Sequence, residues 1–110
     1  MGENRRRSQR VLLRIPAKVH VALEGTTTTF DATTLSVNAQ GGLVVMKQSL
    51  TLNTRLVLEH ANTKERVACR VVRPSRGMPD GFHVAVEFDS PEPDFWRITF
   101  PPSDWSPSDR

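Results

Sequence analysis

The chain has 110 residues, a length that suits one domain and lets about two-thirds of the unfolded surface be buried. Four of its fifteen basic residues and one of its twelve acids lie in the first ten residues, which therefore carry +3, while the other hundred residues are electrically neutral. A single cysteine excludes a disulfide within the chain. No apolar run reaches the ~18 residues of a membrane span or follows the N-terminus as in a signal peptide, so we expect a cytoplasmic protein without membrane insertion.

Alternation of apolar and polar residues predicts strands along most of the chain. Residues 13–24 alternate clearly, and the β-branched residues 26–34 predict a partner strand across a turn at Gly25. The polar residues 35–42 predict a loop or bulge. Further strands are predicted at residues 43–46, 55–60, 65–72 and 82–88, with a hairpin loop at 61–64 and a glycine- and proline-rich loop at 74–81. Six short strands separated by turn signals favour a small antiparallel barrel or sandwich.

The two ends of the chain differ from this body. Residues 1–10 predict a flexible basic arm, because arginines separated by polar residues cannot bury themselves. Residues 90–110 hold five of the eight prolines, and we expect a short helical turn at about 92–99 followed by a proline-rich stretch. Four aromatic residues there predict a lid packed over one end of the barrel: Phe95, Trp96, Phe100 and Trp105. The predicted division is an arm at 1–10, a barrel at 11–89 and a tail at 90–110.

The residue types that could carry catalysis or bind a metal do not occur at the spacing that either role requires. His20, His60 and His83 fall on separate strands without ligand spacing, and we interpret them as surface or rim histidines. Cys69 alternates with valines and is interpreted as a small buried apolar residue. No phosphate loop, metal-binding cluster or catalytic triad pattern occurs. We therefore expect neither an enzyme nor a metal or cofactor site.

Two motifs stand at the borders of predicted strands. Arg6 and Arg10 form an Arg-x-x-x-Arg pair directly before the first strand, and residues 36–41, Ser-Val-Asn-Ala-Gln-Gly, lie between two later strands. With the order of strands and the tail that includes Phe95-Trp96, they resemble the PilZ domain, a family of bacterial receptors for cyclic di-GMP. That family is marked by an Arg-x-x-x-Arg arm and an (Asp/Asn)-x-Ser-x-x-Gly turn on a six-stranded β-barrel. The resemblance covers nearly the whole chain.

The second motif departs from the family pattern. If Gly41 is the motif glycine, Ser36 stands where the family prefers Asp or Asn, and Asn38 stands where it has Ser. Use of the next glycine instead would place Val37 and Ala39 there and lose both polar side chains, so we prefer the first register. A hydroxyl at position 36 replaces a charge-assisted hydrogen bond with a neutral one, which weakens binding by roughly three- to thirty-fold.

The resemblance implies an all-β fold, a six-stranded antiparallel PilZ-like barrel, and a ligand rather than a cofactor. It implies cyclic di-GMP as that ligand, bound by a set of seven residues: Arg5, Arg6, Arg7, Arg10, Ser36, Asn38 and Gly41. The arginines would pair with phosphates or with guanine edges. Binding would then order the arm and pass a signal to a partner protein that the sequence does not identify.

Two alternatives remain open. A PilZ-like barrel that has lost its ligand would serve only as a protein-interaction domain, and the hydroxyl of Ser36 favours this alternative. A small nucleic-acid-binding barrel could use the basic arm on phosphates. The neutral body and the lack of exposed strand aromatics disfavour nucleic acid as a partner.

Overall fold

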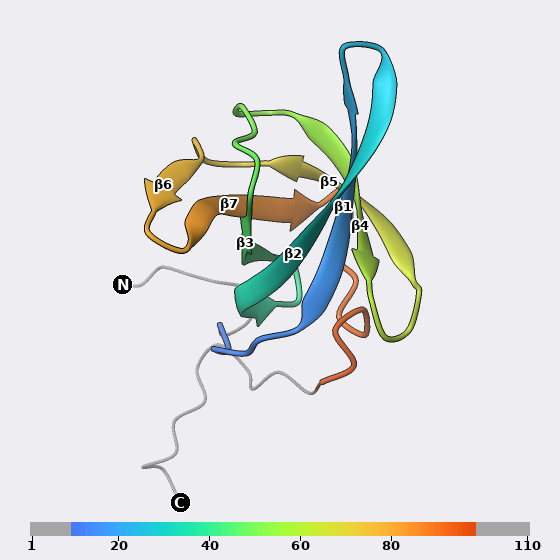
Figure 1. The fold of residues 1–110 in the computed structure, drawn as a ribbon. Helices are drawn as coiled ribbons and strands as arrows, with labels where there is room; N and C mark the ends of the chain where they lie inside the picture. Colours follow the sequence, from blue (N-terminus) through green and yellow to red (C-terminus); the bar gives the residue numbers. More distant parts are fainter. Residues whose placement is uncertain (1–9, 99–110) are drawn as a thin grey trace, which may run out of the picture.

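A computed structural model describes residues 10–98 of the chain. These residues form seven strands and no helix: β1 (Pro16–Leu23), β2 (Thr26–Asn38), β3 (Gly41–Met46), β4 (Arg55–His60), β5 (Arg66–Val71), β6 (Arg76–Met78) and β7 (Gly81–Phe88). Six of them follow the order β3-β2-β1-β4-β5-β7, and an antiparallel pairing of β3 with β7 closes them into a barrel (Figure 1). The strand β6 lies outside the barrel and pairs only with β7. The predicted six-stranded antiparallel barrel is confirmed.

The long strand β2 differs most from its prediction. It runs on to Asn38, so the predicted loop at residues 35–42 is wrong in extent, and only residues 39 and 40 form the turn. The expected irregularity is present as a shift of register between Thr34 and Ser36. The polar segment stays extended because its backbone is paired on both sides, with β3 on one and with residues 11–15 on the other.

The remaining strands lie close to their predicted positions, with one addition. β4 has the predicted bounds, β5 is one residue shorter at each end, β7 begins one residue early, and β3 begins two residues early at Gly41. The predicted loop at 74–81 contains β6, which forms a hairpin with β7. All three residues of β6 are exposed, so its sequence carries no alternation that could have revealed it.

The barrel interior is filled by aliphatic side chains from the alternating positions of its strands. Val19, Leu58, Val71 and Val84 are fully buried, and Cys69 lies among them. Cys69 is fully buried, which confirms its interpretation as a buried apolar residue, and this burial raises the pKa of its thiol to about 12. No helix in the described part of the chain is long and apolar enough to cross a membrane.

Two aromatic residues of the tail complete this core. Phe95 and Trp96 are 5% and 1% exposed, with ring centroids 4.9 Å apart, and both contact Phe88. Their predicted structural role is confirmed, whereas Phe100 and Trp105 lie outside the described residues. The expected helical turn consists of two hydrogen-bonded turns, at residues 92–95 and 94–97. A helix of so few residues is not stable because its nucleation is costly.

His60 contradicts the interpretation of the three histidines as surface or rim residues. His60 is only 4% exposed and lies against the rings of Phe95 and Trp96. Its Nδ1 accepts hydrogen bonds from the backbone N–H groups of residues 62 and 63, and burial lowers its pKa. The prediction failed because an alternating pattern cannot show that the tail covers the end of β4. Among residues 10–98 no cluster of three or more metal-ligating side chains forms.

Candidate functional site: a pocket beside the turn between β2 and β3

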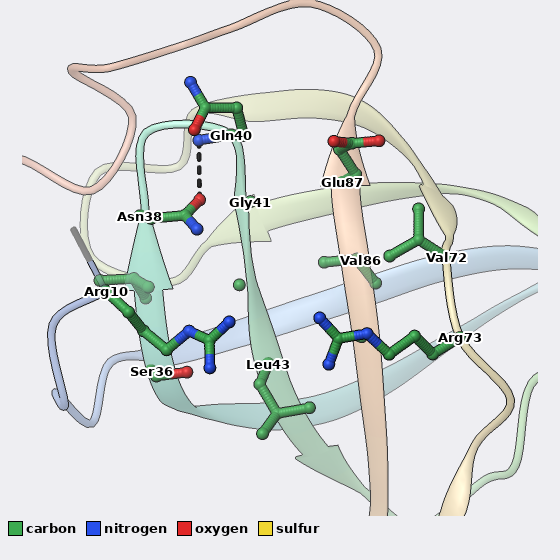
Figure 2. A pocket seen from close by; sticks show the side chains of 13 residues that line it. Arg10, Ser36, Asn38, Gln40, Gly41, Leu43, Val72, Arg73, Val86 and Glu87 are labelled. Atoms are coloured by element: carbon green, nitrogen blue, oxygen red, sulfur yellow. Dashed lines mark hydrogen bonds between the residues drawn. The ribbon is translucent and has the colours of Figure 1, made fainter. Parts of the chain in front are cut away.

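A pocket of about 140 Å³ lies beside the turn that joins β2 to β3 (Figure 2). Sites that enclose a drug-sized ligand measure roughly 300–1,000 Å³, so a dinucleotide would fill this pocket and extend over the surrounding surface. Its walls come from the end of β2, the start of β3, the outer side of β7 and the segment after β5. The described residues that line it are Arg10, Ser36, Val37, Asn38, Gln40, Gly41, Gly42, Leu43, Val72, Arg73, Ala85, Val86 and Glu87.

Two sets of hydrogen bonds hold the turn beside the pocket: one lies within the turn, and the other comes from a buried tryptophan of the tail. The Oδ1 atom of Asn38 accepts a hydrogen bond of 2.8 Å from the backbone N–H of Gln40, which closes the turn (Figure 2). The indole N–H of Trp96 donates to the carbonyl oxygens of Asn38 and Gly41, each at 3.1 Å. The buried tail aromatic therefore fixes the backbone of the predicted ligand-binding turn.

Glycine is required at position 41 by the close approach of β7. A Cβ atom placed there would lie 2.2 Å from the carbonyl oxygen of Val86 and 2.9 Å from the Cα of Glu87. These are backbone atoms of a paired strand and cannot move aside separately. The motif glycine thus allows β3 and β7 to form one continuous wall of the pocket.

Arg10 reaches the pocket because the segment after it is bound to β2. Val11 and Val37 exchange two backbone hydrogen bonds of 2.8 and 2.9 Å. Farther along, the buried hydroxyl of Thr34 accepts from the N–H of Ile15 at 2.8 Å and donates to the carbonyl of Leu13. These contacts place Arg10 next to the turn, with its guanidinium group directed into the pocket (Figure 2).

The charge in the pocket is mainly positive. Arg73 extends from the wall opposite Arg10, and the two guanidinium groups point toward one another (Figure 2). Glu87 is the one acid among the described lining residues, and it forms an ion pair of 3.5 Å with Arg70. Within residues 10–98 no hydrogen bond or ion pair engages the guanidinium of Arg10 or of Arg73. This arrangement suits an anion with hydrogen-bond acceptors on its surface.

Four of the seven residues predicted to bind a ligand meet at this pocket: Arg10, Ser36, Asn38 and Gly41. The other three, Arg5, Arg6 and Arg7, lie outside the described residues. Sequence reasoning missed Arg73 as a lining residue, since an arginine after a predicted strand carries no signal by itself. That these residues bind a ligand stays a prediction.

The family model of the PilZ domain matches residues 4–98, which include Arg6, Arg10 and the turn between β2 and β3. The protein belongs to the PilZ domain family. This confirms the predicted resemblance, and the closed barrel with one outside strand agrees with the PilZ fold. PilZ domains are a family of cyclic di-GMP receptors and act as binding or adaptor modules rather than as enzymes. No curated protein matches the chain at a significant level.

Proposed function

We propose that this PilZ domain binds cyclic di-GMP at the pocket beside the turn between β2 and β3 and signals to a partner protein through residues 1–10. The observation that carries the proposal is the meeting of Arg10 with Ser36, Asn38 and Gly41 around one pocket. Arg10 comes from one end of the chain and the other three from the middle, and the family resemblance alone singled them out as a set.

Each polar side chain of the proposed site has donor or acceptor atoms that could contact the ligand. Arg10 can pair with a phosphate oxygen or with guanine O6 and N7. The carbonyl oxygen of the Asn38 side chain is engaged by Gln40, so its NH₂ group is what remains to donate to guanine O6 or N7. Ser36 offers a hydroxyl that can accept from a guanine N–H. The proposed site therefore contacts phosphate and base together.

Two arginines are not enough for useful affinity. Ordering five backbone residues of the arm costs on the order of 5 kcal/mol, and micromolar binding requires ~8 kcal/mol more. A hydrogen bond to a charged group contributes about 1.5–3 kcal/mol. The arm, the turn and the apolar residues that line the pocket must therefore act together, and the loss of one arginine should abolish measurable binding.

Calorimetric titration with cyclic di-GMP tests the proposal directly. We expect saturable binding by the wild-type protein and none by Arg6→Ala or Arg10→Ala. Arg55→Ala is the matched control, because Arg55 is an exposed arginine paired with Asp89 away from the pocket, and it should bind as the wild type does. Slower amide hydrogen exchange in residues 1–10 with ligand would support the signalling role of the arm. Unchanged exchange there would contradict that role.

A second candidate function is a protein-interaction domain that does not bind the nucleotide. Two observations favour it: Ser36, which supplies only a hydroxyl, is a residue 5% exposed, and the side-chain carbonyl of Asn38 already accepts a hydrogen bond within the turn. Absence of wild-type binding at ~100 μM cyclic di-GMP would support this candidate and reject the first. Binding of DNA or RNA with a steep loss at raised salt would contradict both.

A further inference from the structure

We infer that Arg73 is a second anion-binding residue of this pocket, and that a phosphodiester group of the ligand lies between Arg73 and Arg10. Arg73 belongs to neither sequence motif. The inference rests on the proposed function, since it assigns a contact to the same ligand. It goes further in naming a residue of this chain and the part of the ligand that it contacts.

The backbone around Arg73 places its side chain at the pocket. Arg73 follows the end of β5, and the preceding residue, Val72, donates a backbone hydrogen bond of 3.0 Å to Ala85 of β7. Both Val72 and Ala85 line the pocket. From there the Arg73 side chain extends past β7 toward Arg10, and Leu43 of β3 lies below the two guanidinium groups in the view of Figure 2. The two arginines thus approach the same space from opposite walls.

Arg10 and Arg73 are distinguished by lining the pocket without an ion pair to residues 10–98. Arg14 and Arg76 also form no ion pair within these residues, but neither lines the pocket. Four arginines of the described chain form ion pairs with acids: Arg55, Arg66, Arg70 and Arg97. Arg10 and Arg73 form none with residues 10–98, although both line a pocket that contains Glu87. The acid is directed to Arg70 instead. Two like charges that face each other repel, and an anion placed between them removes that repulsion while accepting hydrogen bonds from both.

The residue at position 36 supports a phosphate rather than a base as the group between them. Ser36 is uncharged, so no carboxylate beside Arg10 offsets the positive potential that Arg10 and Arg73 create. A carboxylate would favour the N–H edge of guanine, whereas unpaired guanidinium groups favour a phosphate. The pocket's acid, Glu87, is paired with Arg70 and does not neutralise the two arginines. The contact with Arg73 therefore offers a source of affinity that the family motif does not supply.

The test is titration of three variants with cyclic di-GMP, after thermal melting has shown that each one folds. We expect Arg73→Ala to raise Kd at least tenfold, as the loss of one charge-assisted contact implies. Arg73→Lys should lose less, because a lysine still binds a phosphate as a point charge. The control Arg55→Ala should stay within twofold of the wild type. The difference between wild type and Arg73→Ala should shrink at high salt, because salt screens an exposed ion pair.

The outcomes separate this inference from the proposed function. A Kd for Arg73→Ala within threefold of the wild type, with binding lost in Arg10→Ala, overturns the role of Arg73 and leaves the ligand assignment standing. Equal losses in Arg73→Ala and Arg73→Lys overturn the contact with phosphate, because they indicate that the guanidinium fork reads a guanine edge. No binding by the wild-type protein overturns both proposals.

Discussion

Replacement of Gly41 by alanine should destabilise the barrel where β3 meets β7. The new Cβ would lie 2.2 Å from the Val86 carbonyl oxygen, far inside a favourable contact of ~3.5 Å, and the strands would have to separate locally. The hydrogen bond of 2.7 Å from Phe88 N–H to the Gln40 carbonyl, next to this point, would weaken with them. Overpacking costs about 1–3 kcal/mol and a weakened hydrogen bond about 1 kcal/mol, against a gain of ~0.4–1 kcal/mol from the stiffer unfolded chain.

The net loss is therefore about 2–3 kcal/mol, which corresponds to a fall in Tm of roughly 10–20 °C for a domain of this size. Urea denaturation followed by tryptophan fluorescence measures the free energy of unfolding. Gly77→Ala is the matched control, because its Cβ would make an ordinary contact of 3.6 Å with the Phe82 ring and should change stability by less than ~0.5 kcal/mol. Equal stability of the two alanine variants would refute the reasoning.

Two further predictions concern the buried tail and its neighbours. Trp96→Phe should keep most of the ring packing but remove the N–H that donates to the carbonyls of Asn38 and Gly41. We expect urea denaturation to show a loss of about 1–2 kcal/mol in the free energy of unfolding, and the amide resonances of the turn to shift. Unchanged resonances there would contradict it. His60 is favoured in its neutral form because burial lowers its pKa, so its contribution to stability is full above its ordinary pKa of 6.5 and is lost as the pH falls below that value. The urea midpoint should drop more between pH 7.5 and 5.5 for the wild type than for His60→Gln, and equal drops would speak against this role.

The strands that could be predicted are those whose side chains alternate between core and solvent. β1 has this pattern, and so does the first part of β4, where Leu56 and Leu58 are buried as predicted. At the end of β4 Glu59 and His60 are buried as well, and alternation did not predict this. The end of β2 escaped prediction because its buried Val37 stands among polar residues, and β6 escaped it because its three residues are exposed and are held by pairing with β7. Periodicity reports the burial of side chains, and it cannot report hydrogen bonds that polar or exposed residues make through the backbone.

Some residues of the candidate site could be predicted from the sequence, and others could not. Arg10, Ser36, Asn38 and Gly41 were found because they belong to motifs of fixed spacing. The roles of Trp96 and Arg73 could not be found that way, since both depend on tertiary contacts. Trp96 holds the turn beside the pocket from within the core, and Arg73 is brought to the pocket by the pairing of Val72 with β7. Residues brought to a site by barrel closure leave no local trace in the sequence.

The pairing of β3 with β7 also bears on the order in which the molecule assembles. It joins residues 41–46 to residues 82–87, while most other strand pairs link neighbours in sequence. Contacts between distant parts of a chain carry the largest loop-closure cost and slow the folding of small β domains. Because this pairing also forms a wall of the pocket, the pocket is complete only after β7, the last strand in the chain, has paired with β3.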